Sequence, residues 1–155
     1  MRERVILLEA SIRSDLAQIE DLFAVLDANA LGSQPSEEKL IVTAYRLHNL
    51  YAAFENIFRN VALAFENTLD DRAGWHRQLL ERMRLDLSPV RPALIDGAAF
   101  EAFDELLRFR HLFRSAYGTR LDAARLSLVL AAAQRLRPIY PAQIEHFLDY
   151  VRAAE

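Results

Sequence analysis

The stretch FRHLFRSAYG, residues 109–118, brings together side chains that are suited to binding phosphate. Arg110 and Arg114 lie one helical turn apart, and Tyr117 follows within two turns of Arg110. An arginine guanidinium is a planar fork of N–H donors that matches the oxygens of a phosphate group. The spacing therefore favours a phosphate-binding site in this stretch, although an exposed arginine such as Arg114 is also typical of an ordinary solvated surface.

Arg110 is the most informative residue of the stretch because of the helix face on which it falls. With about 100° between successive residues, Arg110 and Tyr117 lie within the apolar face of the helix. That face consists of Ala99, Phe103, Leu106, Phe109, Phe113 and Ala116, and the opposite, polar side carries Arg108, His111 and Ser115. An inward guanidinium is costly unless it is paired or hydrogen-bonded.

Two interpretations of Arg110 are open. It either pairs with a carboxylate of an earlier helix, Glu55 or Glu66, and holds the helices together, or it lies at a subunit cleft and binds a phosphate beside Tyr117. The row Asn49, Asn56 and Asn60 has similar alternatives: it lines that cleft and hydrogen-bonds the ligand, or it is solvated on an outer face.

The elements that position these residues are predicted to be helices. Four glycines and five prolines leave little material for hairpins, and no segment alternates β-branched and polar residues. Apolar residues at three- and four-residue steps predict a helix over about 2–28 and another whose apolar seam runs over 40–65. Ser36 is a candidate N-cap for the second of these helices.

Capping and breaking residues mark the remaining boundaries. A short helix is predicted over 75–83 and a long one over about 98–117, ended by Gly118. Asp122 can cap the next helix, which the prolines at positions 138 and 141 should kink or split. We therefore expect an all-α fold, an antiparallel bundle of four or five helices, in a single domain over residues 1–155.

The composition limits the class of protein. The chain has 155 residues, a formal net charge of −3, no cysteine, and no apolar stretch long enough for a membrane span. The N-terminus is soon interrupted by charged residues, so no secretory signal is predicted and a cytoplasmic location is expected. The histidines share no ligand spacing, and we expect neither a metal site nor a cofactor.

Several runs of residues, in this order and at these intervals, resemble the HepT-like proteins of the HEPN superfamily. They are NLYAAFENIF in the second helix, GWHRQLLERM at 74–83, RPALI at 91–95 and LLRFRHLFRSAYGTRLD at 106–122. The resemblance covers nearly the whole chain and implies an all-α homodimer. It further implies a metal-independent ribonuclease toxin that is paired with a nucleotidyltransferase antitoxin.

The family signature is an arginine, four to six further residues and a histidine, often with a tyrosine two positions later. Arg110 matches the arginine and Tyr117 matches the tyrosine, but Ser115 occupies the histidine position. In the family the arginine stabilises the phosphate while the histidine handles protons as the ribose 2′-OH attacks. A serine hydroxyl cannot act as that base, so the resemblance implies weak or no RNA cleavage by this chain.

Other residues have roles that the resemblance also suggests. The family tyrosine receives AMP from the nucleotidyltransferase, which makes Tyr117 a candidate modification site. His111 is the histidine nearest to Arg110, but it lies about 100° around the helix and is not expected to replace the missing base. Arg114, His111 and Asn56 remain candidate RNA contacts. Two further hypotheses are a non-catalytic binding or regulatory module for a nucleotidyltransferase, and a helical dimer without nucleotide chemistry.

Overall fold

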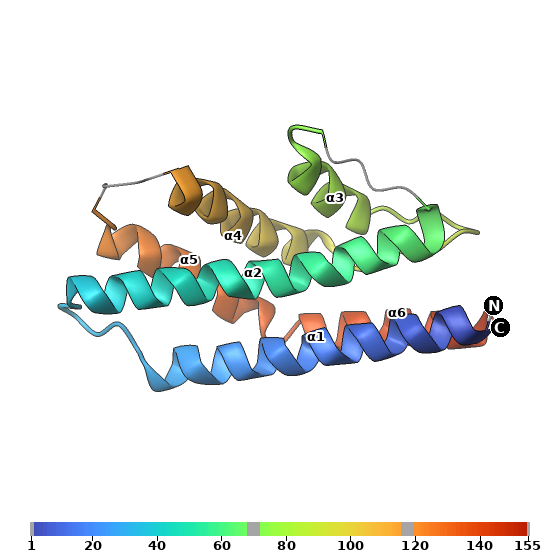
Figure 1. Cartoon of the computed structure of the whole chain (residues 1–155), viewed down its shortest axis with the longest axis horizontal. Coiled ribbons are helices and arrows are strands. Elements are labelled where there is room, and N and C mark those ends of the chain that lie inside the picture. Colours follow the sequence, from blue (N-terminus) through green and yellow to red (C-terminus); the bar gives the residue numbers. More distant parts are fainter. Residues whose placement is uncertain (1, 68–71, 116–119, 155) are drawn as a thin grey trace.

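The computed structural model describes residues 2–67, 72–115 and 120–154 of the chain. These residues contain six helices (Figure 1). The side chains of residues 114 and 115 are outside this description. The helices are α1 (Arg2–Ala28), α2 (Glu37–Glu66), α3 (Trp75–Met83), α4 (Gly97–Ser115), α5 (Ala123–Leu136) and α6 (Tyr140–Ala153). The expected all-α bundle is confirmed, and its last helical segment is split at the two prolines.

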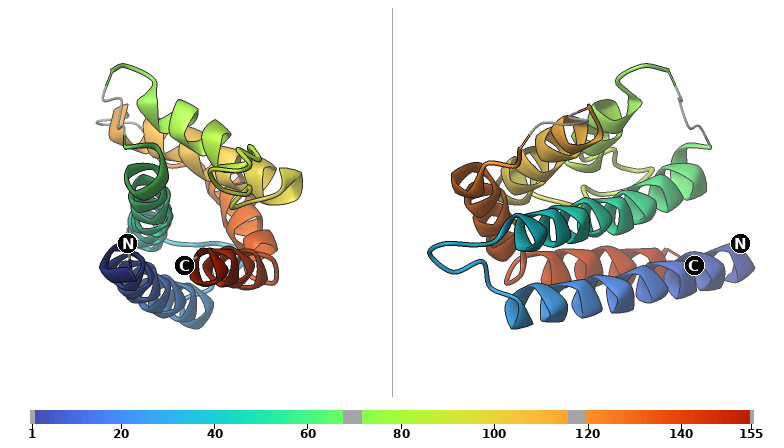
Figure 2. Two further views of the ribbon diagram at one scale, coloured as in Figure 1. Left: turned by 90° about the vertical axis from the view of Figure 1, so that its right-hand side faces the viewer. Right: turned by 60° about the vertical axis from the view of Figure 1, so that its left-hand side comes forward.

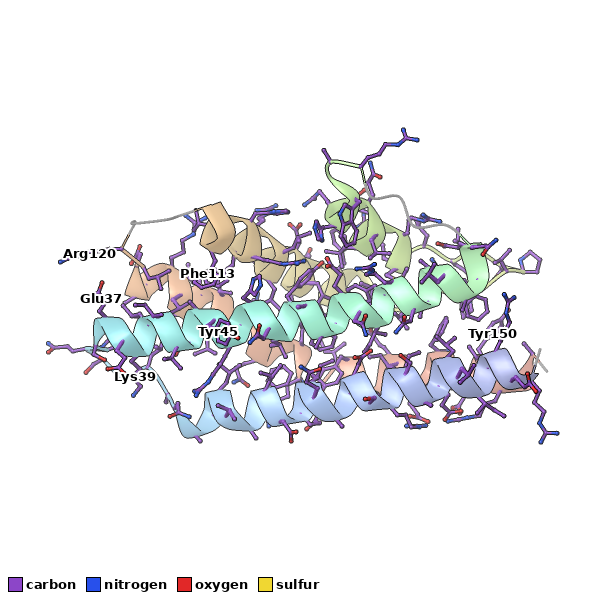
Figure 3. The ribbon with its side chains drawn as sticks, viewed as in Figure 1. Glu37, Lys39, Tyr45, Phe113, Arg120 and Tyr150 are labelled. Atoms are coloured by element: carbon purple, nitrogen blue, oxygen red, sulfur yellow. The ribbon has the colours of Figure 1, made fainter. Side chains whose placement is uncertain are left out.

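Local signals in the sequence define the helix ends. Ser36 caps α2 by accepting a hydrogen bond from the backbone N–H of Lys39 at 3.2 Å, and Glu37 adds negative charge to the same first turn (Figure 3). Asp122 caps α5 in the same way, through the backbone N–H of Ala124 at 3.0 Å. Pro141 lies in the first turn of α6, where its missing N–H costs no intrahelical hydrogen bond.

α2 is the central helix of the bundle. Figure 2 shows α1 and α6 on one side of α2, and α3 and α4 on the other. Aromatic side chains fill the space between α2 and its neighbours: the rings of Phe54 and Phe58 both meet Phe103 of α4 edge-to-face, at centroid distances of 4.8 and 5.2 Å. Because these rings are almost fully buried, they fix the register of α4 against α2.

A buried arginine, Arg91, links the segment between α3 and α4 to the end of α2. Arg91 has no exposed surface, and its guanidinium binds Glu66 at the end of α2 at 2.8 Å. The same guanidinium donates to the backbone carbonyls of Arg82, Leu85 and Pro92. This network positions α3 beside the C-terminal half of α2.

The two ends of the described chain lie side by side (Figure 1). Arg152 of α6 binds Glu9 of α1 at 2.6 Å, and Arg13 of α1 binds Glu145 of α6 at 3.0 Å. Among the described helices, none is long and apolar enough to cross a membrane.

Candidate functional site

Three helices meet at Glu55, a carboxylate in the middle of α2. Arg110 of α4 donates from Nη1 to Glu55 Oε1 at 2.8 Å, and Nδ1 of His76, on α3, lies 2.7 Å from Glu55 Oε2. The guanidinium Nη1 and the imidazole Nδ1 are themselves 3.1 Å apart. We call Glu55, His76 and Arg110 the Glu55 cluster.

The Glu55 cluster is largely removed from water. The side chains of Glu55, His76 and Arg110 are 6%, 14% and 13% exposed. Arg110 takes its inward direction from the apolar face of α4, as its position on the helical wheel predicts. A carboxylate and a guanidinium at this depth neutralise each other, and their attraction is stronger than it would be at the surface.

The geometry of the cluster determines which nitrogen of His76 carries the proton. An ionised carboxylate only accepts hydrogen bonds, so the Nδ1 that faces Glu55 Oε2 must carry an N–H. Arg110 then donates to the other oxygen of Glu55 and only approaches Nδ1. In neutral His76 the lone pair is therefore on Nε2, the ring nitrogen on the side away from Glu55.

Aromatic and charged groups surround the imidazole. The Trp75 ring stacks on the His76 ring with a centroid distance of 3.6 Å, and Arg59 of α2 lies over Trp75 at 5.3 Å. The ring of His111, on the exposed side of α4, meets His76 edge-to-face at 5.9 Å. The site thus combines two imidazoles and two guanidiniums around one buried carboxylate.

A second ion pair holds α3 against α4 next to the cluster. Asp104 binds Arg77, the neighbour of His76, and also binds Arg108 at 2.8 Å.

On the α2 side, burial raises the pKa of Tyr51, with a further contribution from the negative charge of Glu55. Tyr51 therefore stays a neutral phenol beside the cluster.

Of the two carboxylates that the sequence offers to Arg110, the structure selects Glu55. Glu66 is occupied by other arginines, Arg91 at 2.8 Å and Arg82 at 2.5 Å. The expected ion pair between the helices is present, and it also includes the unexpected His76.

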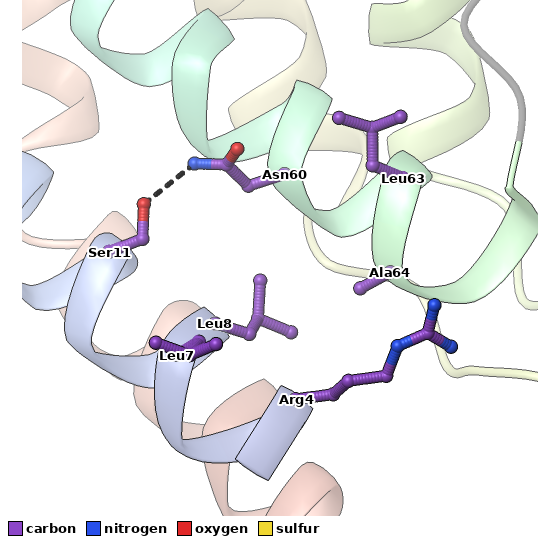
Figure 4. A pocket seen from close by; sticks show the side chains of 7 residues that line it. All are labelled: Arg4, Leu7, Leu8, Ser11, Asn60, Leu63 and Ala64. Carbon is purple, nitrogen blue, oxygen red and sulfur yellow. Dashed lines mark hydrogen bonds between the residues drawn. The ribbon is translucent and has the colours of Figure 1, made fainter. Parts of the chain in front are cut away.

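The other residues singled out in the sequence lie in different places. Asn56 faces α1 and donates to Asp15 at 2.9 Å, and Asn60 donates to Ser11 at 2.8 Å (Figure 4). Asn56 and Asn60 therefore bind α1 rather than the Glu55 cluster. Tyr117, together with the side chains of Arg114 and Ser115, falls outside the described residues.

Among the described residues, no group of three or more histidine, cysteine, aspartate or glutamate side chains could hold a metal ion. Comparisons with curated proteins and with solved structures gave no match. A family model described as HepT-like protein matches residues 42–151, which is more than half of the chain. The chain belongs to the HepT-like protein family.

The matched region of this HepT-like chain contains the whole Glu55 cluster and leaves out α1. Arg110, which the sequence resemblance assigns to the family arginine, binds the buried carboxylate of Glu55. His76 is the member of the cluster that sequence reasoning missed as a functional residue. His76 lies in the run GWHRQLLERM, one of the runs that carry the family resemblance, and this was the signal in the sequence that could have marked it. The packing of α3 against α2 and α4 is what places its imidazole beside Arg110.

Proposed function

We propose that this HepT-like chain is a ribonuclease toxin that acts as a homodimer and is neutralised by a nucleotidyltransferase antitoxin. The observation that carries the proposal is the position of Arg110 in a partly buried cluster with an imidazole, in a chain whose resemblance to the family assigns Arg110 to the signature arginine. Such a site can stabilise a phosphodiester and move a proton without a metal ion.

Arg110 has the chemistry that cleavage needs. Its guanidinium binds the scissile phosphate and stabilises the negative charge that builds on the phosphate oxygens as the ribose 2′-OH attacks. Glu55 occupies Nη1 and Nε is buried, which leaves Nη2 of the guanidinium for the substrate. Because Ser115 stands at the position of the family histidine, we expect slower cleavage than in a chain with histidine there.

The test is cleavage of a labelled tRNA pool, with a chelator present, by the chain and by its Ser115→His variant. A general base contributes about 10²–10⁴ to a rate, so we expect Ser115→His to raise the cleavage rate by up to that factor. Arg110→Ala should abolish the activity of both proteins. The matched control is Arg108→Ala, since Arg108 lies on the same helix but is 65% exposed. The proposal would be refuted if neither the parent chain nor Ser115→His cut RNA.

Ser115 also favours a second candidate function, a non-catalytic module that binds and regulates a nucleotidyltransferase. In that case neither the parent chain nor Ser115→His cuts RNA, but both bind a nucleotidyltransferase.

Tyr117 is the proposed site at which the nucleotidyltransferase attaches AMP. Intact-mass measurement after incubation with that enzyme and ATP should show an added AMP, and Tyr117→Phe should remove it. Addition of AMP to Tyr117→Phe at the rate of the parent chain would refute this assignment.

A further inference from the structure

We infer that His76 is the general base of this site, and that it carries out the proton transfer that Ser115 cannot perform. The inference rests on the proposed ribonuclease function. It assigns the remaining activity to an imidazole on α3, far in sequence from the stretch around Arg110.

The first argument is the position of His76 relative to the phosphate-binding group. Its Nδ1 is 3.1 Å from Arg110 Nη1, so the imidazole lies directly beside the guanidinium that is proposed to hold the phosphate. A general base must reach the proton it removes directly or through one water molecule. Ser115 is on the same helix as Arg110, but about 140° around it.

The second argument is the orientation of the ring. Glu55 accepts from Nδ1 at 2.7 Å, which fixes the tautomer and leaves the lone pair on Nε2. A carboxylate on the far nitrogen of a histidine base also stabilises the imidazolium that forms when the base takes up a proton. Stacking on Trp75 fixes the plane of the ring. Glu55 is thus a positioning residue that serves both the base and the phosphate-binding arginine.

The reaction balances without any further co-reactant except water. Nε2 of His76 takes the proton of the ribose 2′-OH, and the 2′-oxygen forms a bond to phosphorus. The bond from phosphorus to the 5′-oxygen breaks, with its electron pair on that oxygen. The imidazolium proton then passes through a water molecule to the 5′-oxygen, which leaves a 2′,3′-cyclic phosphate, a 5′-hydroxyl and neutral His76.

The decisive variant is His76→Asn, tested in two backgrounds. The asparagine amide can still donate to Glu55, where Nδ1 donates in the parent, but it has no basic nitrogen. In the parent chain we expect the cleavage rate to fall by about 10²–10⁴. In the Ser115→His background, where a second base is present, we expect the same substitution to cost less than about tenfold.

Two controls separate chemistry from folding. Added imidazole should restore part of the cleavage by His76→Ala, because it supplies the missing base in solution. His146→Asn should leave the rate unchanged, since His146 is exposed on α6, on the opposite side of the bundle from α3 (Figure 1).

Three results would overturn the inference while leaving the ribonuclease function intact. They are an equal loss from His76→Asn in both backgrounds, no loss in the parent chain, and a parent chain that is inactive while Ser115→His cleaves. If the parent and Ser115→His are both inactive, the proposed function itself is wrong and the inference falls with it.

Discussion

Removing the carboxylate of Glu55 should destabilise the protein strongly. Glu55 is 6% exposed and accepts hydrogen bonds from Arg110 at 2.8 Å and from His76 at 2.7 Å. In Glu55→Ala, a guanidinium that is only 13% exposed loses its counter-charge, and His76 loses the acceptor for its Nδ1 proton. Removing one partner of a buried ion pair costs about 3–5 kcal/mol, because the other charge is left uncompensated.

Urea unfolding measures this loss. With a slope of about 2 kcal/mol per molar urea, we expect Glu55→Ala to lower the midpoint by about 1.5–2.5 M. Glu55→Gln keeps the size and one acceptor for Arg110, so we expect it to cost about 1–3 kcal/mol. The matched control is Glu101→Ala, on an exposed position of α4, which should leave the midpoint almost unchanged.

A double substitution tests the cause of the effect. If the cost arises from an unpaired charge, then Glu55→Leu combined with Arg110→Met should be more stable than the sum of the two single losses predicts. Additive losses, or a Glu55→Ala midpoint equal to that of Glu101→Ala, would refute the reasoning that the pair is buried and coupled.

Three further predictions concern the scaffold. Arg91→Met should lower the free energy of unfolding by about 3–5 kcal/mol, because Arg91 is fully buried and ion-paired; in urea unfolding, a loss no greater than that of exposed Arg135→Met would contradict this. Ser36→Ala should cost about 1 kcal/mol through the lost cap of α2, and an unchanged thermal midpoint would show that the cap contributes nothing. The backbone N–H of Ala99 lowers the pKa of Asp96, so the folded state binds this proton less readily than the unfolded state. The ionised carboxylate of Asp96 therefore adds to the free energy of unfolding near neutral pH, and this stabilisation is lost as pH falls below about 4. Between about pH 6 and about pH 3 the urea midpoint of Asp96→Asn should fall less than that of the parent. Equal falls in the two proteins would exclude the stabilisation.

The helices could be predicted because their signals are local. The bounds of α1 follow from apolar periodicity, α3 spans the range predicted for it, and Ser36 and Asp122 act as the caps that their positions predict. The inward direction of Arg110 follows from the same periodicity, since its side chain falls within the apolar face of α4.

The composition of the site could not be predicted because it depends on packing between distant segments. Glu55 and Glu66 both lie on α2, and which of them meets Arg110 depends on where α4 packs along α2; Glu66 binds Arg91 instead. Nothing near His76 in the sequence indicates that α3 packs where its imidazole meets Arg110. Periodicity gives the direction of a side chain on its own helix, but not the partner that it meets.

The contact between α1 and α6 has a consequence for the topology of the chain. Because Arg152 binds Glu9 beside the two described ends, a short linker can join those ends, and a new start can be opened in the exposed segment between α1 and α2. The rearranged chain would run from α2 through α6 and finish with α1. The three helices that carry the Glu55 cluster would then remain consecutive in the rearranged chain.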